Sequence, residues 1–400
     1  MKITFLLTQS LESPSGLGRY WPLSKELVRL GHEVTILALH HNFQTLTQRR
    51  FVTDGVKVHY VGQMHVRKVG NSKFYFSPIH LMWIAGLATW RLARAALQTP
   101  TDVYHLGKPH PMNGLAVLLP RLLRSKPVYL DCDDYEAMSN RFEGNWQRRV
   151  VAYFEDHLPA IAAGITVNTH FALERLQASG YPDERIVYIP NGVDRHRFSC
   201  IDDATVDALR RQLGLVGRKV VLYVGSLSLA SHAVDLLLEA FAIVQQIEPR
   251  AVLLLVGGGE DYEALQSQVA ALRLSDRVRF VGRVLPDQVP AYYLLADASV
   301  DPVRDDPAER ARSPLKVVES LASGTPVVTG DVGDRSAQLA HGGGLLVLPD
   351  DSGALAKVLV AILQDPALHT RLSAEALAVR EQHYWDRLVH DFASIYDKAA

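Results

Sequence analysis

The chain has only two cysteines, Cys132 and Cys200, among its 400 residues. Two thiols cannot form a disulfide framework or a cysteine-rich zinc site, and their scarcity is typical of proteins in a reducing cytoplasm. An apolar run of 18 or more residues is also missing, so the sequence predicts no transmembrane helix. The opening residues MKITFLL are too few for the core of a signal peptide, and we expect them to form the first strand.

The sequence also lacks internal repeats, low-complexity tracts and a strong net charge. The formal net charge is -1, with 21 Lys or Arg and 15 Asp or Glu in the first 190 residues against 21 and 28 in the remainder. A basic half can favour an anionic partner such as a membrane surface, although a mixed surface charge without a function explains the same counts. The counts give no reason to expect a nucleic-acid partner.

The most apolar stretch, residues 79–97, contains two arginines at helical spacing. This pattern predicts an amphipathic helix packed on a core, and the alternative is peripheral contact with the inner face of a membrane. We therefore expect a cytoplasmic protein, with membrane association as the open alternative.

What the sequence does contain is a regular alternation of short apolar runs and longer helical patterns, which predicts parallel sheets covered by helices. Predicted strands of the first half are residues 2–8, 33–39, 57–60, 103–105, 128–131, 164–168 and 186–189. Those of the second half are 219–224, 251–256, 278–281, 298–301, 326–329 and 344–348. With 48% hydrophobic residues, the chain can bury the cores of two domains.

The segment IPNGVDRHRF, residues 189–198, interrupts any regular element and marks a hinge. We therefore expect a first domain over residues 1–190 and a second over 191–379. The tail from residue 380 to 400 is predicted to be helical, and its aromatic and apolar residues at helical spacing form a face that must be buried.

Doubly wound sheets bind ligands at the carboxyl ends of their strands, so function is expected in the loops that follow strands. Gly16 and Gly18 follow the first predicted strand and precede a helix, where glycines let backbone N–H groups approach an anion. The third glycine of the dinucleotide fingerprint and the acidic residue after the second strand are missing. An NAD-dependent dehydrogenase is therefore the least favoured enzyme class.

Four strand-loop-helix units in the second half place their loops on one edge of the predicted sheet. They read KVVLYVGSLSLASHAVDLLLEAF, AVLLLVGGGEDYEAL, VRFVGRVLPDQVPAYYLLADASVDP and RSPLKVVESLASGTPVV. With GLGRY, VYIPNGVDRHRF and GGLLVLPDD, their order and spacing resemble glycosyltransferases of the GT-B fold, most of all family 4. Members of that family retain the anomeric configuration and use nucleotide-sugar donors, and the similarity covers nearly the whole chain.

The resemblance implies an α/β protein with two Rossmann-like, doubly wound domains that face each other across a cleft. The first domain would bind the acceptor, the second would bind the nucleotide diphosphate-sugar, and the C-terminal helix would cross back to the first domain. The implied reaction moves a hexosyl group from a UDP-sugar or GDP-sugar to a hydroxyl of a glycan, a lipid-linked or a small-molecule acceptor. It implies front-face displacement with no metal and no other cofactor.

Glu319 is the residue that the resemblance assigns to the ribose of the donor. A carboxylate suits a vicinal diol because it accepts two hydrogen bonds at once. By the same resemblance, Ser313 and the backbone near Leu315 hold phosphate, while Lys316 or Arg312 supplies positive charge.

The donor's base is expected to contact mainly the backbone from Val281 to Arg283.

A first departure from the family concerns the Arg and Lys that relatives carry after residues 219–224. They are replaced here by Ser226 and, allowing a one-residue gap, His232. Losing two cations costs several kcal/mol of transition-state stabilisation unless others substitute, and we expect Arg312, Lys316 and Arg283 to do so.

A second departure is Ala311, which aligns with the first Glu of the family motif, a residue that usually touches the sugar. Asp305, Asp306 and Glu309 lie nearby in the sequence and are candidates to replace it. Their Asp-Asp-Pro context is also typical of a solvated turn.

A third departure is Asp133, followed by Asp134, where many relatives have a His near the reacting sugar. An acidic pair at a strand end can accept a hydrogen bond from a sugar hydroxyl, and mutual repulsion would raise one pKa toward a useful range. Metal binding is the alternative role. His105 and His110 are predicted on the adjacent loop, either lining the acceptor side or packing, and we select Asp133 and His105 as catalytic candidates.

The leading hypothesis is thus a retaining glycosyltransferase. The same departures favour, as a rival, a protein that binds a nucleotide-sugar without transferring it. A GT-B sugar-nucleotide epimerase needs further acidic catalytic residues that the sequence does not place, and a phosphorylase needs a cofactor lysine and a much longer chain.

Overall fold

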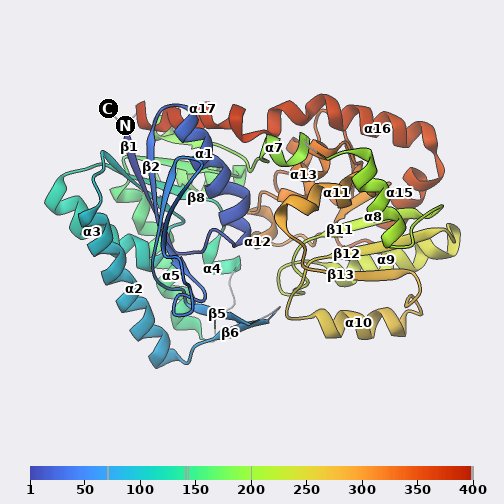
Figure 1. Ribbon diagram of the computed structural model, residues 1–400, viewed down its shortest axis with the longest axis horizontal. Helices are drawn as coiled ribbons and strands as arrows, with labels where there is room; N and C mark the ends of the chain where they lie inside the picture. The colour runs from blue at the N-terminus through green and yellow to red at the C-terminus, as the bar shows by residue number, and fades with distance from the viewer. Residues whose placement is uncertain (70–71, 140–141, 143, 200, 398–400) are drawn as a thin grey trace. The chain divides into compact units, whose positions relative to one another are not determined.

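The computed structural model describes residues 1–69, 72–139, 142, 144–199 and 201–397; Cys200 and residues 398–400 lie outside these ranges. The chain divides into two compact units (Figure 1). We call them the N-terminal unit, made of Met1–Pro190, Ala311–Ser313 and Trp385–Ala400, and the C-terminal unit, made of Asn191–Arg310 and Pro314–Tyr384.

An eight-stranded sheet forms the centre of the N-terminal unit in the part of the chain that the structure describes, in the order β10-β9-β8-β7-β1-β2-β4-β3. Neighbouring strands are parallel except β3 and β4, which are antiparallel. The strands are β1 (Lys2–Leu7), β2 (Glu33–His40), β3 (Arg50–Thr53), β4 (Val56–Gln63), β7 (Val103–Gly107), β8 (Val128–Cys132), β9 (Gly164–Val167) and β10 (Ile186–Tyr188). A separate hairpin pairs β5 (Val66–Val69) with β6 (Ser72–Tyr75).

Helices cover both faces of this sheet because successive strand residues point to opposite faces. Ile3, Phe5 and Leu7 of β1 share a core with α1 and α17. Leu6 belongs to a second core with α2 and α3. The helices of the unit are α1 (Trp21–Arg29), α2 (Pro78–Gln98), α3 (Pro111–Arg124), α4 (Glu136–Ser139), α5 (Asn145–His157), α6 (His170–Ala178) and α17 (Trp385–Asp397).

The C-terminal helix α17 belongs to the N-terminal unit, as the resemblance predicted. Trp385, Phe392 and Tyr396 are buried in its core, and α17 lies along α1 (Figure 1). Tyr384 packs instead in a core of the C-terminal unit and pairs with Val193 in an isolated bridge. The chain therefore passes from one unit to the other between two consecutive aromatic residues.

The C-terminal unit is built on a parallel sheet of six strands among its described residues, in the order β13-β12-β11-β14-β15-β16. The strands are β11 (Lys219–Val224), β12 (Ala251–Val256), β13 (Val278–Gly282), β14 (Ala298–Asp301), β15 (Val327–Gly330) and β16 (Gly344–Val347). One core lies between the sheet, α9, α10 and α15, and another between the sheet, α8, α11 and α13. This unit is also doubly wound.

The helices of the C-terminal unit are α7 (Arg195–Ser199), α8 (Asp203–Gln212), α9 (Val234–Ile247), α10 (Tyr262–Ala271), α11 (Val289–Leu295), α12 (Pro307–Arg310), α13 (Leu315–Ser323), α14 (Arg335–Gln338), α15 (Ser352–Gln364) and α16 (Pro366–Val379). Among the helices that the structure describes in either unit, none has the length and hydropathy needed to cross a bilayer.

The strands predicted from the sequence are all present, each within three residues of its predicted ends. The helix predicted over residues 79–97 is α2, and the helix of the tail is α17. The sequence missed β3 and the β5–β6 hairpin, which are short and lack an apolar run.

Candidate functional site

Each sheet has one topological switch point, where strand order reverses. It lies between β1 and β7 in the N-terminal unit and between β11 and β14 in the C-terminal unit. Open parallel sheets bind ligands at the carboxyl ends of the strands at such a point. The candidate residues are therefore those that follow β1 and β7 in one unit, and β11 and β14 in the other.

Backbone contacts hold together the loops at the carboxyl ends of the strands in the C-terminal unit. The N–H of Gly225 donates to the carbonyl of Val256 at 2.9 Å, and the N–H of Gly257 donates to the carbonyl of Gly282 at 2.8 Å. A Cβ on Gly257 would lie 1.9 Å from the carbonyl oxygen of Gly225, and its φ of +142° also favours glycine. The loops after β11, β12 and β13 thus lie directly against one another.

Lys316, in the first turn of α13, reaches this switch point. Its Nζ lies 3.1 Å from Oδ1 of Asp301, the last residue of β14, and 5.6 Å from the centroid of the Tyr223 ring on β11. A Cβ on Gly225 would lie 3.3 Å from Cε of Lys316. The side chain predicted to supply positive charge is therefore next to the glycine loop that follows β11.

Asp301 is shared between two cations. Besides Lys316, Arg335 contacts it, with Nε donating to Oδ2 at 2.8 Å, and Arg335 also pairs with Glu309 at 2.7 Å. Burial raises the pKa of Asp301, but Lys316 and Arg335 outweigh burial and hold the pKa well below its usual range. Because these two carboxylates and two cations balance, this group has no net charge.

Glu319 lies one turn after Lys316 on α13 and is partly buried. The hydroxyl of Tyr293 donates to its Oε2 at 3.2 Å. Burial raises the pKa of Glu319, against the lowering effects of Arg197, Tyr293 and Lys316. The helix ends at Ser323 as predicted, because Gly324 adopts a φ of +72° and caps it.

The other predicted donor-binding residues occupy several positions. Ser226 is partly buried and its carbonyl accepts a hydrogen bond from Tyr223 at 2.8 Å; the ring of His232 lies 6.4 Å from that of Tyr223. Val281 is partly buried near the end of β13, and Arg283 is exposed just beyond it. Ser313 is buried, Arg312 is partly buried, and Leu315 is the first residue of α13.

Each of the three carboxylates suggested as a replacement for the missing Glu at Ala311 has another partner in the structure. Asp305 is paired with Arg310 at 2.6 and 2.8 Å, and Asp306 accepts the backbone N–H of Glu309 at 2.9 Å. Glu309 is buried and paired with Arg335. These contacts argue against the suggested replacement.

In the N-terminal unit, a buried network that sequence reasoning missed lies under the loop after β1. Arg19 donates to both oxygens of Asp131 at 2.6 and 2.7 Å, and Tyr20 and Thr166 donate to the same carboxylate. Burial raises the pKa of Asp131, but Arg19 lowers it more. The signal in the sequence was an Arg directly after the Gly-Leu-Gly turn and an Asp within a buried strand.

The loop after β1 is also held by the C-terminal helix. The indole N–H of Trp385 donates to the carbonyl of Gly18 at 2.9 Å. A Cβ on Gly16 would lie 2.4 Å from the carbonyl oxygen of Ser10. Gly16 thus has a packing reason for its position, independent of any anion.

Asp133 lies just after β8 in a cluster of acids around one lysine. Nζ of Lys108 lies 3.1 Å from Asp133, 2.6 Å from Asp134 and 2.7 Å from Glu136. Burial, together with the neighbouring acids, raises the pKa of Asp133 to about 7 in spite of Lys108. The sequence missed Lys108 and Glu136, whose proximity arises only when β7 and β8 pair.

His105 does not have the position expected for a catalytic residue. It lies within β7, is fully buried, and its Nδ1 is 2.8 Å from the hydroxyl of Tyr396. Its ring stacks between Phe5 and Phe392. Burial lowers the pKa of His105 to about 4. The catalytic prediction is wrong for this residue, which is part of the core under α17.

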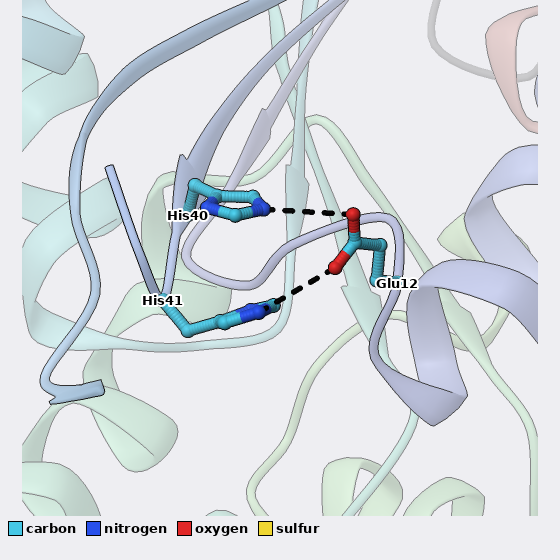
Figure 2. Close-up of side chains that lie close together, drawn as sticks. All are labelled: Glu12, His40 and His41. Carbon is cyan, nitrogen blue, oxygen red and sulfur yellow. Dashed lines mark ion pairs between the residues drawn. The ribbon is translucent and has the colours of Figure 1, made fainter. Parts of the chain in front are cut away.

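Glu12, His40 and His41 form one of two groups of potential metal ligands among the described residues, and Asp133, Asp134 and Glu136 form the other. Figure 2 shows both imidazoles pointing at the Glu12 carboxylate, with Nε2 of His40 and of His41 at 3.7 and 3.4 Å from it. The N–H of Asn42 donates to Nδ1 of His40 at 3.0 Å.

The hydrogen bond from Asn42 to Nδ1 places the proton of a neutral His40 on Nε2, toward Glu12. A metal bound at Nε2 would need the other tautomer, with two N–H groups facing each other. The cluster therefore fits a contact that ties the loop after β1 to the end of β2. In the acidic group, the ammonium of Lys108 already occupies the space among the three carboxylates.

Two family models match the chain. One described as "Glycosyl transferase 4-like domain" matches residues 15–192, and one described as "Glycosyl transferases group 1" matches residues 218–365. The chain carries two glycosyltransferase domains and resembles family 4. The first match lies in the N-terminal unit except for its last two residues, and the second lies in the C-terminal unit except for residues 311–313.

Solved structures show that these two domains have the GT-B fold. HepE of Anabaena in complex with UDP superposes with a TM-score of 0.71 at 20% identity, over 99% of this chain and 100% of that one. Sucrose-phosphate synthase of Thermosynechococcus elongatus superposes with a TM-score of 0.78 at 20% identity, over 99% and 98% of the two chains.

Curated relatives match over shorter regions. Mannosylfructose-phosphate synthase of Agrobacterium fabrum is 28% identical over 300 residues, which cover 73% of this chain and 61% of the relative. A GDP-mannose-dependent phosphatidylinositol monomannoside mannosyltransferase of Mycolicibacterium smegmatis is 28% identical over 55% of this chain and 56% of the relative. The matches thus span less than two thirds of these relatives.

Proposed function

We propose that the protein is a retaining glycosyltransferase, which moves a sugar from a nucleotide diphosphate-sugar to an acceptor hydroxyl without a metal ion. The observation that carries the proposal is Lys316 beside the glycine loop at the β11/β14 switch point. A mostly buried ammonium next to a partly buried glycine loop at a strand end suits a diphosphate, because the low dielectric strengthens its charge interactions. The GT-B fold and both family matches support it.

In this proposal the diphosphate lies against Lys316 and the loop after β11, with Arg312 and Arg283 as further cations. Glu319 accepts hydrogen bonds from the ribose hydroxyls. Tyr293 orients the Glu319 carboxylate through its hydroxyl.

The acceptor oxygen forms a bond to the anomeric carbon as the bond from that carbon to the phosphate oxygen breaks on the same face. Because the new bond forms on the face from which the diphosphate leaves, the configuration is retained, and the acceptor's proton passes to the departing diphosphate. Asp133, with its raised pKa, accepts a hydrogen bond from an acceptor or sugar hydroxyl. No covalent nucleophile is required.

For the donor we propose a UDP-sugar or a GDP-sugar. UDP is bound in the HepE structures, and GDP-mannose is named as the donor of several relatives. For the acceptor we propose a glycan, a lipid-linked or a small polar molecule, since relatives are named for fructose-phosphate, inositol-phosphate and phosphatidylinositol products. We place the protein in the cytoplasm, with peripheral contact to a membrane.

A panel of UDP, GDP, ADP and dTDP tests the donor class by thermal shift, because a ligand that binds the native state raises the unfolding midpoint. Incubation of the protein with UDP- and GDP-sugars in EDTA, followed by NMR of the released or transferred sugar, then tests the reaction. Turnover with retained anomeric configuration is expected. Turnover only after addition of a divalent cation, or with inversion, would contradict the proposed mechanism.

Ala311 favours a second candidate, a protein that binds a nucleotide-sugar without transferring it. The carboxylate that usually touches the sugar is absent, and the three nearby acids are engaged elsewhere. Tight binding of a nucleotide diphosphate with neither hydrolysis nor transfer, across the donor panel, would establish this candidate instead.

A further inference from the structure

Helix α2 has a buried face and an exposed apolar face. Ala88 and Leu92 are buried in the core with the sheet, and Ile84 is also buried. The exposed large apolar side chains of α2 are Ile79, Met82, Trp83 and Trp90. The helix predicted to be amphipathic therefore buries one apolar face and leaves a second one in solvent.

Helix α3 repeats this arrangement beside α2 (Figure 1). Met112, Ala116 and Val117 face the core. Its exposed large apolar side chains are five leucines at helical spacing, Leu115, Leu118, Leu119, Leu122 and Leu123, the last two exposed by 77% and 64%. Contiguous apolar surface of this kind is uncommon on a monomer and marks a contact with a partner or a membrane.

Positive charge predominates on α2, α3 and the segments that flank them in the sequence, whereas α5, which contacts α3, carries charges of both signs. Residues 55–130 contain ten Lys or Arg and a single acid, Asp102, and neither α2 nor α3 contains any acid. Arg121 is exposed next to the leucines, and the guanidinium of Arg94 lies over the Trp90 ring at 5.6 Å. Arg124 donates to the carbonyls of Leu97 and Thr99, which fixes the end of α3 against the end of α2.

We propose that the α2–α3 surface docks on a bilayer that contains anionic phospholipid, which deepens the peripheral membrane contact proposed above. Leucine and tryptophan side chains enter the interface while arginines contact lipid phosphates. Neither helix is able to span the bilayer, so both lie on it. A second copy of the chain fits this surface less well, because a symmetric contact would bring two positively charged surfaces together.

Sedimentation of the full chain with lipid vesicles tests the proposal. We expect more protein bound to phosphatidylcholine vesicles with about one third phosphatidylglycerol than to phosphatidylcholine alone, and less binding as salt is raised. The double variant Leu122→Ser/Leu123→Ser and the double variant Arg94→Gln/Arg121→Gln should each reduce vesicle binding roughly tenfold. All four side chains lie on the α2–α3 surface, so the thermal midpoint should change little.

The matched control is Val216→Ser/Leu285→Ser, which removes two exposed apolar side chains of the C-terminal unit. It should bind vesicles like the wild type. Equal binding by all variants, or no binding to anionic vesicles, would overturn the proposal. So would a leucine variant that turns a dimer into a monomer while vesicle binding stays absent, since the surface would then serve self-association. The shift of the midpoint by UDP or GDP is measured in parallel, so failure of nucleotide binding is seen separately.

Discussion

Each unit places one mostly buried lysine at the switch point of its sheet, and the two lysines have different surroundings. Lys108, after β7, contacts Asp133, Asp134 and Glu136, so the surrounding carboxylates outnumber it. Lys316 contacts Asp301, whose charge Arg335 also balances. A diphosphate would be repelled at the first position and accepted at the second. The difference supports the proposal that the anionic donor binds the C-terminal unit and the neutral acceptor hydroxyl binds the N-terminal unit.

The largest effect is expected at Lys108. Lys108→Met leaves three neighbouring carboxylates without their cation, two of them buried, and should lower the free energy of unfolding of the N-terminal unit by about 3–5 kcal/mol. Urea denaturation measures this loss in the free energy of unfolding. The control Lys57→Met removes an exposed ion pair with Glu33 and should cost less than about 1 kcal/mol. Similar losses in both variants would show that the acid cluster does not depend on Lys108.

Asp133→Asn is expected to change how the free energy of unfolding depends on pH. The pKa of Asp133 is raised to about 7, so the native state binds this proton more tightly than the unfolded state, and wild-type stability falls as pH rises from about 4 to about 7. The variant lacks this loss. It should be more stable than wild type by about 1–3 kcal/mol at pH 8, and the difference should close near pH 4.

Thermal or urea unfolding at several pH values measures this difference. Asp207→Asn, at an exposed position of α8, controls for the removal of one carboxylate. A stability difference that is constant across the pH range would contradict the raised pKa of Asp133.

Glu319→Ala tests the assignment of the ribose to the C-terminal unit. Loss of the hydrogen bonds to the vicinal diol should weaken UDP or GDP binding about tenfold, by calorimetry. The affinities of the variant and the wild type should differ less for a 2′-deoxy nucleotide than for the ribose nucleotide. Glu239→Ala, on the exposed side of α9, is the control and should bind like wild type. An equal loss for ribose and deoxyribose nucleotides would show that Glu319 does not contact the diol.

The sequence predicted the architecture well because the strands are buried runs of β-branched and aliphatic residues between turn residues. It also predicted α13 and its stop at Gly324, which depend on local signals. It failed where the structure depends on distant partners. His105 was expected at the end of the strand predicted over residues 103–105, next to the adjacent loop, but β7 continues to Gly107 and carries His105 under Tyr396, 291 residues away in the sequence.

The candidate site shows the same limit. Lys316 was selected from a local motif, and the structure places it at the switch point. The pairing of Asp305 with Arg310 and of Glu309 with Arg335 required the folded chain, as did the three acids around Lys108. The exposed leucines of α3 could have been noticed in the sequence, because five lie at helical spacing opposite an equally apolar face.

The most direct test of the account compares Lys316→Ala with wild type for binding of a nucleoside diphosphate and of the bare nucleoside, using calorimetry. Removal of the ammonium should weaken binding of UDP or GDP by about 10- to 100-fold and leave binding of uridine or guanosine nearly unchanged. Lys357→Ala, at an exposed position of α15 in the same unit, should change neither. Equal effects of Lys316→Ala on nucleotide and nucleoside would contradict the assignment of the diphosphate to this lysine.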